Sequence, residues 1–365
     1  MPAPKNSFKA ALKSGFPQIG CWIGMANAYT AEIAATAEFD WLLVDGEHAP
    51  NDLRSILEQV QVIEGSGRTA VARLPIGETW MIKQYLDAGV QSILVPMVES
   101  GVQAQELVRA VRYPPHGVRG VGSSLARASR FAAIPDYLKT ADAQICLLVQ
   151  VENRLGLAAL DEILTTDVDG VFIGPADLAA DMGHIGNANH PEVVEVVLDA
   201  LQRIVSAGKA AGILTLDPVM QRKCLDLGVT FLATDIDVTL FAQAMRRAAQ
   251  TGVRLLPDRV VAGVAQTTAA SKYIQQLCKH WSHKAKVSFN ETEGSVDFAN
   301  GNGVTLSATK SNLKIEAFTG ARGDLKKWQE VIESHLARFA FREDFRIEWL
   351  QEPELRSALK RSEND

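Results

Sequence analysis

Short apolar runs alternate with longer amphipathic segments between residue 18 and about residue 250. The segments between the runs, such as NDLRSILEQVQVI, repeat their apolar residues with the period of a helix; most begin with acids or Asn and end with Gly. Repeated β–α units of this kind predict a TIM barrel, a closed parallel sheet surrounded by helices. A doubly wound sheet is the alternative, but it often has a Gly-rich phosphate turn after its first strand, where this chain reads Trp-Ile-Gly. The eight runs cover residues 18–24, 41–48, 69–75, 92–98, 145–152, 170–178, 210–216 and 231–237.

The pattern changes near residue 250, so we predict a barrel domain over residues 1–250. Residues 251–270 show no clear period, which is typical of a linker. Residues 271–352 carry alternating strands and two amphipathic helices and predict a small α+β domain, followed by a polar tail at residues 353–365. The first of these helices has an apolar face made of Tyr273, Ile274, Leu277 and Trp281.

Charge and cysteine content exclude several classes of protein. A formal net charge of -6 argues against nucleic acid as the main partner and favours small molecules. The four cysteines stand singly, without the close pairs of a zinc knuckle or the framework of a disulfide scaffold, and this fits a reduced cytoplasm. No apolar run approaches the ~20 residues of a membrane helix, so no membrane partner is expected.

The second apolar run ends abruptly on ionisable residues. Asp45, Glu47 and His48 follow directly after a run that is apolar at every position. A histidine beside two acids at the carboxyl end of a parallel strand is a candidate general base, because active sites of barrels lie at these ends. The alternative is a strand that runs into a solvated turn.

Polar residues also end the third, fifth and sixth runs. Glu152 and Asp177 offer two carboxylates, which suit a hard cation such as Mg²⁺ or Mn²⁺, although a pair of acids bound by nearby arginines is equally compatible with the spacing. Arg73 is a candidate to neutralise an enolate or to bind a carboxylate, or else a core arginine paired with an acid. Gln150 completes the set of polar residues at the predicted barrel mouth.

The segment RGVGSSLARASRF, residues 119–131, predicts a long active-site loop after the fourth run. It contains glycines but not the dinucleotide-binding fingerprint, so we reject a nucleotide site. Arg127 and Arg130 are candidates to meet an anionic substrate, and a solvated basic loop is the alternative.

Several motifs together resemble the class II pyruvate aldolases of the HpcH/HpaI type. They are DGEHAP at 45–50, Arg73, LVPMV at 94–98, RYPPHGVRGVGSSLARASR at 112–130, LVQVE at 148–152 and GPADL at 174–178. The resemblance covers roughly residues 6 to 250, and within the family it is greatest to the 4-hydroxy-2-oxoheptane-1,7-dioate aldolases of aromatic-acid catabolism, with 2-keto-3-deoxy sugar-acid aldolases as relatives. The last ~100 residues resemble a small bacterial domain family of unknown function.

The resemblance implies a cytoplasmic lyase that cleaves 4-hydroxy-2-keto acids into pyruvate and an aldehyde, such as succinic semialdehyde. It implies a homo-oligomer, a hexamer in related proteins, and a divalent metal ion, magnesium, manganese or cobalt, held by Glu152 and Asp177. Arg73 would stabilise the enolate, and His48 would be the base, oriented by Asp45 and Asp87. The implied substrate contacts are Trp22, Gln150, Gly174, Pro175, Ala176, Leu216 and Arg127.

Asp235 departs from the family pattern, in which a small residue is expected in the eighth strand. A carboxylate there is expected near the barrel mouth, and the sequence leaves open whether it binds a second ligand, alters the choice of acceptor or weakens anion binding.

Two other functions compete with the metal-dependent lyase. An aldolase using a lysine Schiff base requires a lysine at the end of a strand, but Lys83 lies in a predicted helix and Lys209 precedes its strand. The third option is a non-catalytic binding protein with a degenerate barrel. In the tail, His280, His283 and His335 are candidates for a metal or anion site, and helix-surface histidines are the alternative.

Overall fold

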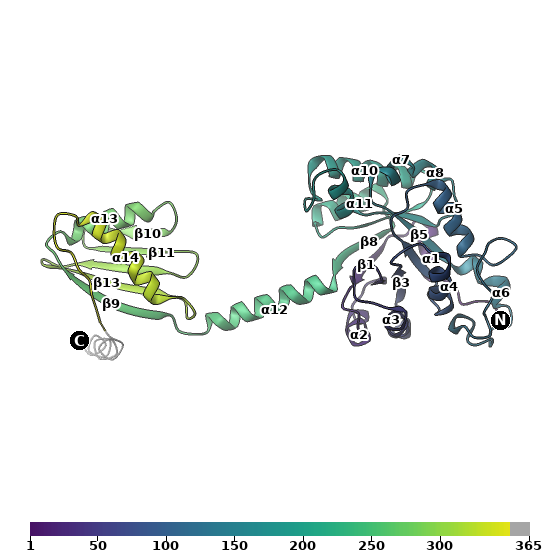
Figure 1. The fold of residues 1–365 in the computed structure, drawn as a ribbon, viewed down its shortest axis with the longest axis horizontal. Helices are drawn as coiled ribbons and strands as arrows, with labels where there is room; N and C mark the ends of the chain where they lie inside the picture. Colours follow the sequence, from purple (N-terminus) through teal and green to yellow (C-terminus); the bar gives the residue numbers. More distant parts are fainter. Residues whose placement is uncertain (351–365) are drawn as a thin grey trace. The chain divides into compact units, whose positions relative to one another are not determined.

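Eight parallel strands close into a barrel in the first part of the chain (Figure 1). The computed structural model describes residues 1–350, so the polar tail expected at residues 353–365 lies outside the described residues. Each strand of the barrel falls within one of the eight apolar runs, which confirms the TIM barrel. The strands are β1 (Gln18–Ile23), β2 (Trp41–Asp45), β3 (Thr69–Arg73), β4 (Ser92–Val95), β5 (Cys146–Val151), β6 (Gly170–Ile173), β7 (Ala210–Leu214) and β8 (Phe231–Ile236).

Helices connect the strands, and their sequences explain where they begin and which face is buried. The side chain of Asp52 accepts hydrogen bonds from backbone N–H groups at the start of α3. The Ser55 side chain in turn accepts a hydrogen bond from the backbone N–H of Asp52, which completes a capping box. Within residues 1–350, none of the helices is both long and apolar enough to cross a membrane. The helices up to the eighth strand are α1 (Ser7–Lys13), α2 (Ala28–Ala35), α3 (Leu53–Gly65), α4 (Thr79–Asp87), α5 (Gly101–Ala110), α6 (Tyr137–Thr140), α7 (Arg154–Ala158), α8 (Leu160–Leu164), α9 (Pro175–Asp181), α10 (Pro191–Ser206) and α11 (Pro218–Leu227).

Side chains alternate between the barrel interior and the layer under the helices. In β2, Trp41 and Leu43 belong to the interior cluster, whereas Leu42 and Val44 pack under the helices. Gly20 makes room for Trp41, because a Cβ at residue 20 would lie 2.2 Å from the indole ring. Helix α1 adds Phe8 to the same interior cluster. The barrel is therefore packed through its centre, and Asp45, two residues after Leu43, also points inward.

A second unit follows the barrel, with its own sheet and core. The boundary between the two compact units falls between Gln243 and Ala244, within helix α12 (Asp237–Arg254). The sheet has the order β10-β11-β12-β13-β9-β14, and both helices lie on one face of it (Figure 1). Its elements are β9 (Arg259–Gln266), α13 (Ala270–Trp281), β10 (Lys286–Phe289), β11 (Glu293–Asp297), β12 (Gly303–Ala308), β13 (Asn312–Thr319), α14 (Leu325–Phe339) and β14 (Glu348–Trp349).

The interval 251–270, expected to be a linker, contains the end of α12 and the whole of β9. Strand β9 pairs with β13 over its full length and is an interior strand of the sheet. Its buried residues alternate along the strand and include Val261 and Ala265. The expectation was wrong because Gly and Ala at alternate positions give a weak strand signal, and only pairing with β13 makes the segment extended.

The position of β9 predicts the boundary of a fragment that folds alone. Residues 255–365 should unfold cooperatively on heating, because they contain the whole sheet and its core. Residues 267–365 should not, because they lack the partner of β13 and the apolar contacts of Val261 and Ala265. Circular dichroism during heating measures the difference. Equal melting temperatures for the two fragments would contradict the central role of β9.

Candidate active site

Asp45 and Arg73 form a buried ion pair at the carboxyl ends of β2 and β3. The two residues are register partners on adjacent strands. Arg73 donates from Nε to Asp45 Oδ1 at 2.8 Å and from Nη2 to Asp45 Oδ2 at 2.6 Å, which is the two-point geometry that a guanidinium makes with a carboxylate. Burial alone would raise the pKa of Asp45, but Arg73 and two backbone N–H groups outweigh burial and hold that pKa below its usual value. Asp45 is therefore ionised and holds Arg73 in place.

Glu47 and His48 continue from this pair toward solvent. Asp45 Oδ1 accepts hydrogen bonds from the backbone N–H groups of Glu47, at 3.0 Å, and His48, at 3.4 Å. Glu47 Oε2 lies 2.8 Å from Arg73 Nη1 and 3.9 Å from His48 Nε2. The His48 side chain is 66% exposed. Asp45 therefore positions His48 through its backbone, and Glu47 is the carboxylate nearest to its ring.

Glu152 is a buried acid at the end of β5. Its Oε1 accepts a hydrogen bond from the backbone N–H of Met97 at 2.9 Å, and its Oε2 is bound by the Gln150 amide. Burial, together with the negative charges of Glu47 and Asp177, raises the pKa of Glu152 to about 7, although the two hydrogen bonds lower it. Glu152 is thus partly protonated near neutral pH, and a bound cation would favour its charged form.

Gly174 permits the close approach of the sixth strand to Glu152. A Cβ at residue 174 would lie 2.5 Å from Glu152 Oε2. Helix α9 then begins at Pro175, which has no N–H group, so Ala176 and Asp177 supply the next backbone donors of its first turn. The Asp177 side chain raises the pKa of both Glu47 and Glu152. These acids share one electrostatic environment.

Two further predicted residues lie at the same end of the barrel. The Trp22 indole donates to Asp45 Oδ2 at 3.3 Å, and its ring lies 5.0 Å from the Arg73 guanidinium carbon. Leu216 follows β7 and is half exposed.

The charged groups come from the ends of β2, β3, β5 and β6, and β4 contributes through the N–H of Met97. This cluster therefore comes from β2 to β6. The carboxylates that follow β7 and β8 make other contacts: Asp217 caps α11, and Asp237 accepts hydrogen bonds from the backbone N–H groups of Gly24 and Met25.

The structure separates Asp87 from this group. Asp87 is the last residue of α4, which returns from the end of β3 toward the start of β4, so it lies at the opposite end of the barrel. There it accepts a hydrogen bond from Arg119 at 2.9 Å. The structure gives His48 no contact with Asp87 within the described residues, in contrast to the expectation from the family.

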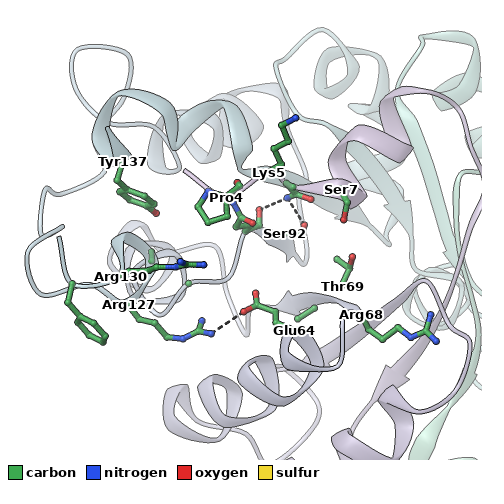
Figure 2. A pocket seen from close by; sticks show the side chains of 17 residues that line it. Pro4, Lys5, Ser7, Glu64, Arg68, Thr69, Ser92, Arg127, Arg130 and Tyr137 are labelled. Atoms are coloured by element: carbon green, nitrogen blue, oxygen red, sulfur yellow. Dashed lines mark hydrogen bonds and ion pairs between the residues drawn. The ribbon is translucent and has the colours of Figure 1, made fainter. Parts of the chain in front are cut away.

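Arg127 and Arg130 also lie at the amino ends of the strands (Figure 2). They line a cavity of about 540 Å³ together with residues that precede β3 and β4. Arg127 donates to the carbonyl oxygen of Ala88 and to Glu64. The expected active-site loop is therefore not at the mouth of its own barrel. The expectation failed because α5 intervenes after β4 and carries the chain back to the amino end before the loop begins.

Asp235 belongs to the outer face of the barrel rather than to the mouth. It is the register partner of Cys21, whose side chain packs in the layer under the helices, and paired residues of parallel strands point to the same face. Burial, with the charges of Asp237 and Asp235, raises the pKa of the Cys21 thiol to about 12. The expectation of an added carboxylate at the mouth is corrected accordingly.

The three histidines of the second unit lie close together but are packed against aromatic rings. The rings of His280 and His335 have centroids 5.3 Å apart, and His280 also contacts Phe339. His335 Nδ1 is bound to the carbonyl oxygen of Val331 at 2.8 Å. Burial lowers the pKa of His280, as do the neighbouring histidines. These contacts favour the structural alternative over a ligand site.

Sequence analysis noted Glu47 beside His48 but assigned it no role. Its position in the motif DGEH was the available signal, but only the folded chain shows its side chain beside Arg73 and His48. Burial raises the pKa of Glu47, as do the charges of Asp45 and Asp177, while Arg73 and His48 lower it. Oxygen donors without a thiol suit a hard divalent cation, and the carboxylates of Glu152 and Asp177, which raise each other's electrostatic cost at this end of the barrel, fit that donor type.

Comparisons with known proteins match the two units separately. Residues 18–244 match the family described as HpcH/HpaI aldolase/citrate lyase, and residues 262–350 match a family described as an uncharacterized protein conserved in bacteria, DUF2218. A hydroxypyruvate/pyruvate aldolase of Roseovarius nubinhibens is 60% identical over 248 residues, 68% of this chain and 96% of that protein.

Two further relatives agree with this match. A 4-hydroxy-2-oxo-heptane-1,7-dioate aldolase of Shigella boydii is 52% identical over 66% of this chain and 92% of that protein. The crystal structure of a family protein from Burkholderia cenocepacia superposes with a TM-score of 0.65 at 37% identity, over 68% of this chain and 99% of that one.

The raised pKa of Glu152 predicts how the stability of the metal-free protein depends on pH. Folding raises this pKa from 4.5 to about 7, so the unfolded chain binds fewer protons between these values, and the free energy of unfolding falls as pH rises through the window. At about 1.4 kcal/mol per pKa unit, this loss amounts to a few kcal/mol. The Glu152→Gln variant should lack it.

Urea unfolding in chelator, at pH values on both sides of that window, measures the difference. Glu106→Gln, on the exposed face of α5, is the matched control and should follow the wild-type dependence. A Glu152→Gln protein with the same pH dependence as wild type would show that Glu152 ionises normally.

Proposed function

Because the chain belongs to the HpcH/HpaI aldolase/citrate lyase family, we propose that it is a divalent-metal-dependent aldolase whose nucleophilic substrate is pyruvate or hydroxypyruvate. The observation that carries the proposal is the grouping of Arg73, Glu152 and Asp177 around Glu47 at one end of the barrel. An enolate, which is the anion common to both substrates, needs positive charge beside its oxygen atoms. This site combines a fixed guanidinium with two acids suited to hold a cation.

Glu152 and Asp177 would hold the metal ion, either magnesium, manganese or cobalt. A bound divalent ion supplies Lewis acidity toward the keto and carboxylate oxygens of the substrate. The raised pKa of Glu152 supports this assignment. Burial and the neighbouring acids disfavour its charged form, and a bound cation would offset that cost. The N–H groups of Ala176 and Asp177, at the start of α9, would receive the substrate carboxylate, and Gly174 lets the backbone before them approach Glu152.

Arg73 would stabilise the enolate oxygen. Of the five N–H groups of the guanidinium, two donate to Asp45 and a third lies beside Glu47, so two donors remain for the substrate. The guanidinium is held by its two hydrogen bonds to Asp45 and packs against the Trp22 ring. Arg73 therefore would not need to move when negative charge develops on the substrate.

His48 would act as the base in cleavage. It removes the proton from the C4 hydroxyl, and the C3–C4 bond breaks. The aldehyde leaves, and the electron pair of that bond remains on the pyruvate enolate. Proton transfer to C3 of the enolate then yields pyruvate. The imidazolium formed at His48 is compensated by Glu47, whose carboxylate lies 3.9 Å away. Asp45 positions the His48 backbone, and no role is assigned to Asp87 of the same chain.

The donor specificity follows the relatives of higher identity. The relative named hydroxypyruvate/pyruvate aldolase is 60% identical and the one named 4-hydroxy-2-oxo-heptane-1,7-dioate aldolase is 52% identical. We therefore favour hydroxypyruvate and pyruvate as donors over a role confined to heptanedioate cleavage in aromatic catabolism. A 2-keto-3-deoxy sugar-acid aldolase is the second candidate. Trp22 and Leu216 would contact the substrate, and the assembly would be a homo-oligomer.

The proposal predicts metal-dependent deuterium exchange at C3 of both donors in D₂O. Chelation should abolish exchange and magnesium, manganese or cobalt should restore it, as followed by NMR. Glu152→Gln and Asp177→Asn should lose exchange at matched metal concentration, while Glu106→Gln should retain it. Full exchange in chelator, together with borohydride trapping of a lysine adduct, would replace the proposal with a Schiff-base aldolase.

The division of roles predicts that His48→Ala loses cleavage but keeps part of the exchange at C3 of pyruvate. Loss of a general base costs about 10²–10⁴ in rate, whereas Arg73 and the metal site still support the enolate. Pyruvate release from 4-hydroxy-2-keto acids measures cleavage. His116→Ala, an exposed histidine, is the control. If exchange falls as far as cleavage does, His48 is not confined to the acceptor side.

A further inference from the structure

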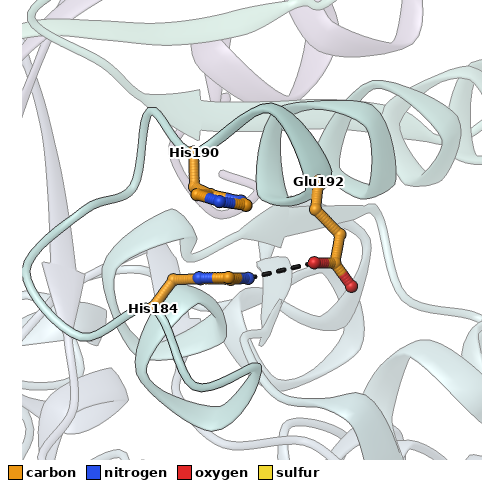
Figure 3. Close-up of side chains that lie close together, drawn as sticks. All are labelled: His184, His190 and Glu192. Atoms are coloured by element: carbon orange, nitrogen blue, oxygen red, sulfur yellow. Dashed lines mark hydrogen bonds and ion pairs between the residues drawn. The ribbon is translucent and has the colours of Figure 1, made fainter.

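A second group of candidate metal ligands lies outside the proposed catalytic site. Within residues 1–350, the group of three His, Cys, Asp or Glu side chains whose ligand atoms lie within 4.8 Å of one another is His184, His190 and Glu192 (Figure 3). His184 and His190 belong to the connection between α9 and α10, and Glu192 to the first turn of α10. We propose that these three residues form a binding site for a zinc-type divalent transition metal.

The three side chains are held together by contacts of unequal kind. His184 Nε2 lies 3.0 Å from Glu192 Oε2, and the rings of His184 and His190 are stacked with centroids 3.6 Å apart and planes 14° apart. Glu192 therefore forms its hydrogen bond with the His184 ring and not with the His190 ring. In the described part of the chain, His190 Nδ1 is buried without a hydrogen-bond partner. A buried nitrogen of this kind calls for a ligand that no residue provides.

Protonation does not satisfy both rings. Two imidazolium ions stacked face to face repel each other, and one carboxylate compensates a single positive charge. A metal ion accepts a lone pair from each neutral imidazole and carries the charge that Glu192 balances. Binding requires one ring to tilt out of the parallel stack so that both nitrogens point at the ion. Glu192 is 63% exposed and free to follow.

The donor set selects the class of metal. Two imidazole nitrogens and one carboxylate oxygen suit zinc, and similarly cobalt or nickel, at about 2.0–2.2 Å per bond. The proposed catalytic acids, Glu152 and Asp177, offer oxygen only and suit a harder ion. The chain would therefore separate two classes of divalent metal by ligand type.

The backbone around the ligands is already ordered by turns. The His184 N–H donates to the carbonyl oxygen of Ala179 at 2.7 Å, and the His190 N–H donates to that of Asn187 at 3.0 Å. His190 then accepts at its carbonyl oxygen from Val194 in the first turn of α10. A bound ion would fasten the beginning of α10 to the segment that follows α9, the helix that carries Asp177 in its first turn.

Zinc binding to the full-length chain tests the proposal. The Glu152→Gln/Asp177→Asn protein, whose catalytic acids are removed, should bind one zinc ion per chain at micromolar zinc in equilibrium dialysis. Added zinc should raise its melting temperature by about 2 °C or more. His184→Ala and His190→Ala should each lose the ion and the thermal shift, and Glu192→Gln should bind at least tenfold more weakly.

His280→Ala and His283→Ala are the matched controls and should retain the ion. Zinc retained by His184→Ala and His190→Ala but lost by the controls would place the site in the second unit and overturn the proposal. Absence of zinc binding would overturn it as well. If the double variant does not fold, the wild type should bind one ion more than His190→Ala, and equal stoichiometry would refute the site. Exchange at C3 of pyruvate is measured separately, so failure here leaves the aldolase proposal intact.

Discussion

The arrangement of the candidate active site depends on the buried pair of Asp45 and Arg73. Two charges removed from water are stable only when they bind each other closely, and loss of one partner of such a pair typically costs about 3–5 kcal/mol. Here the pair spans two neighbouring strands whose register places the residues side by side. The same carboxylate receives the Trp22 indole and the backbone of Glu47 and His48. One acid therefore fixes the position of a cation, an aromatic ring and the candidate base.

The barrel and much of its polar rim could be predicted from the sequence because parallel strands buried on both faces leave nearly continuous apolar runs. Each run ends where polarity returns, and this rule located Asp45, Arg73, Gln150 and Glu152 at one end of the barrel. The rule also explains the errors. The segment around Arg127 follows helix α5, and Asp87, which only the family resemblance suggested, ends helix α4, so in both cases the chain had already returned to the opposite end.

Other features of the site arise only from tertiary contacts. Met97 adopts a φ of 54°, a left-handed conformation that destabilises the backbone of a non-glycine residue by on the order of 1 kcal/mol. No pattern in the sequence predicts this conformation. Its backbone N–H reaches Glu152, which also packs against Gly174. Strand β9 escaped prediction for a related reason, because its small residues become extended through pairing with β13.

The side chains at the rim of the barrel differ in how many partners they hold. Asp45, Arg73 and Glu47 are joined by ion pairs, and Glu152 is bound by Gln150 and the Met97 N–H, so a substitution among them disturbs several partners at once. Leu216, which follows β7, is half exposed and is not one of these residues, and Asp237, which follows β8, binds the backbone of Gly24 and Met25 instead. A substitution at Leu216 would therefore change the surface beside the site without breaking the hydrogen bonds and ion pairs that hold Arg73 and Glu152.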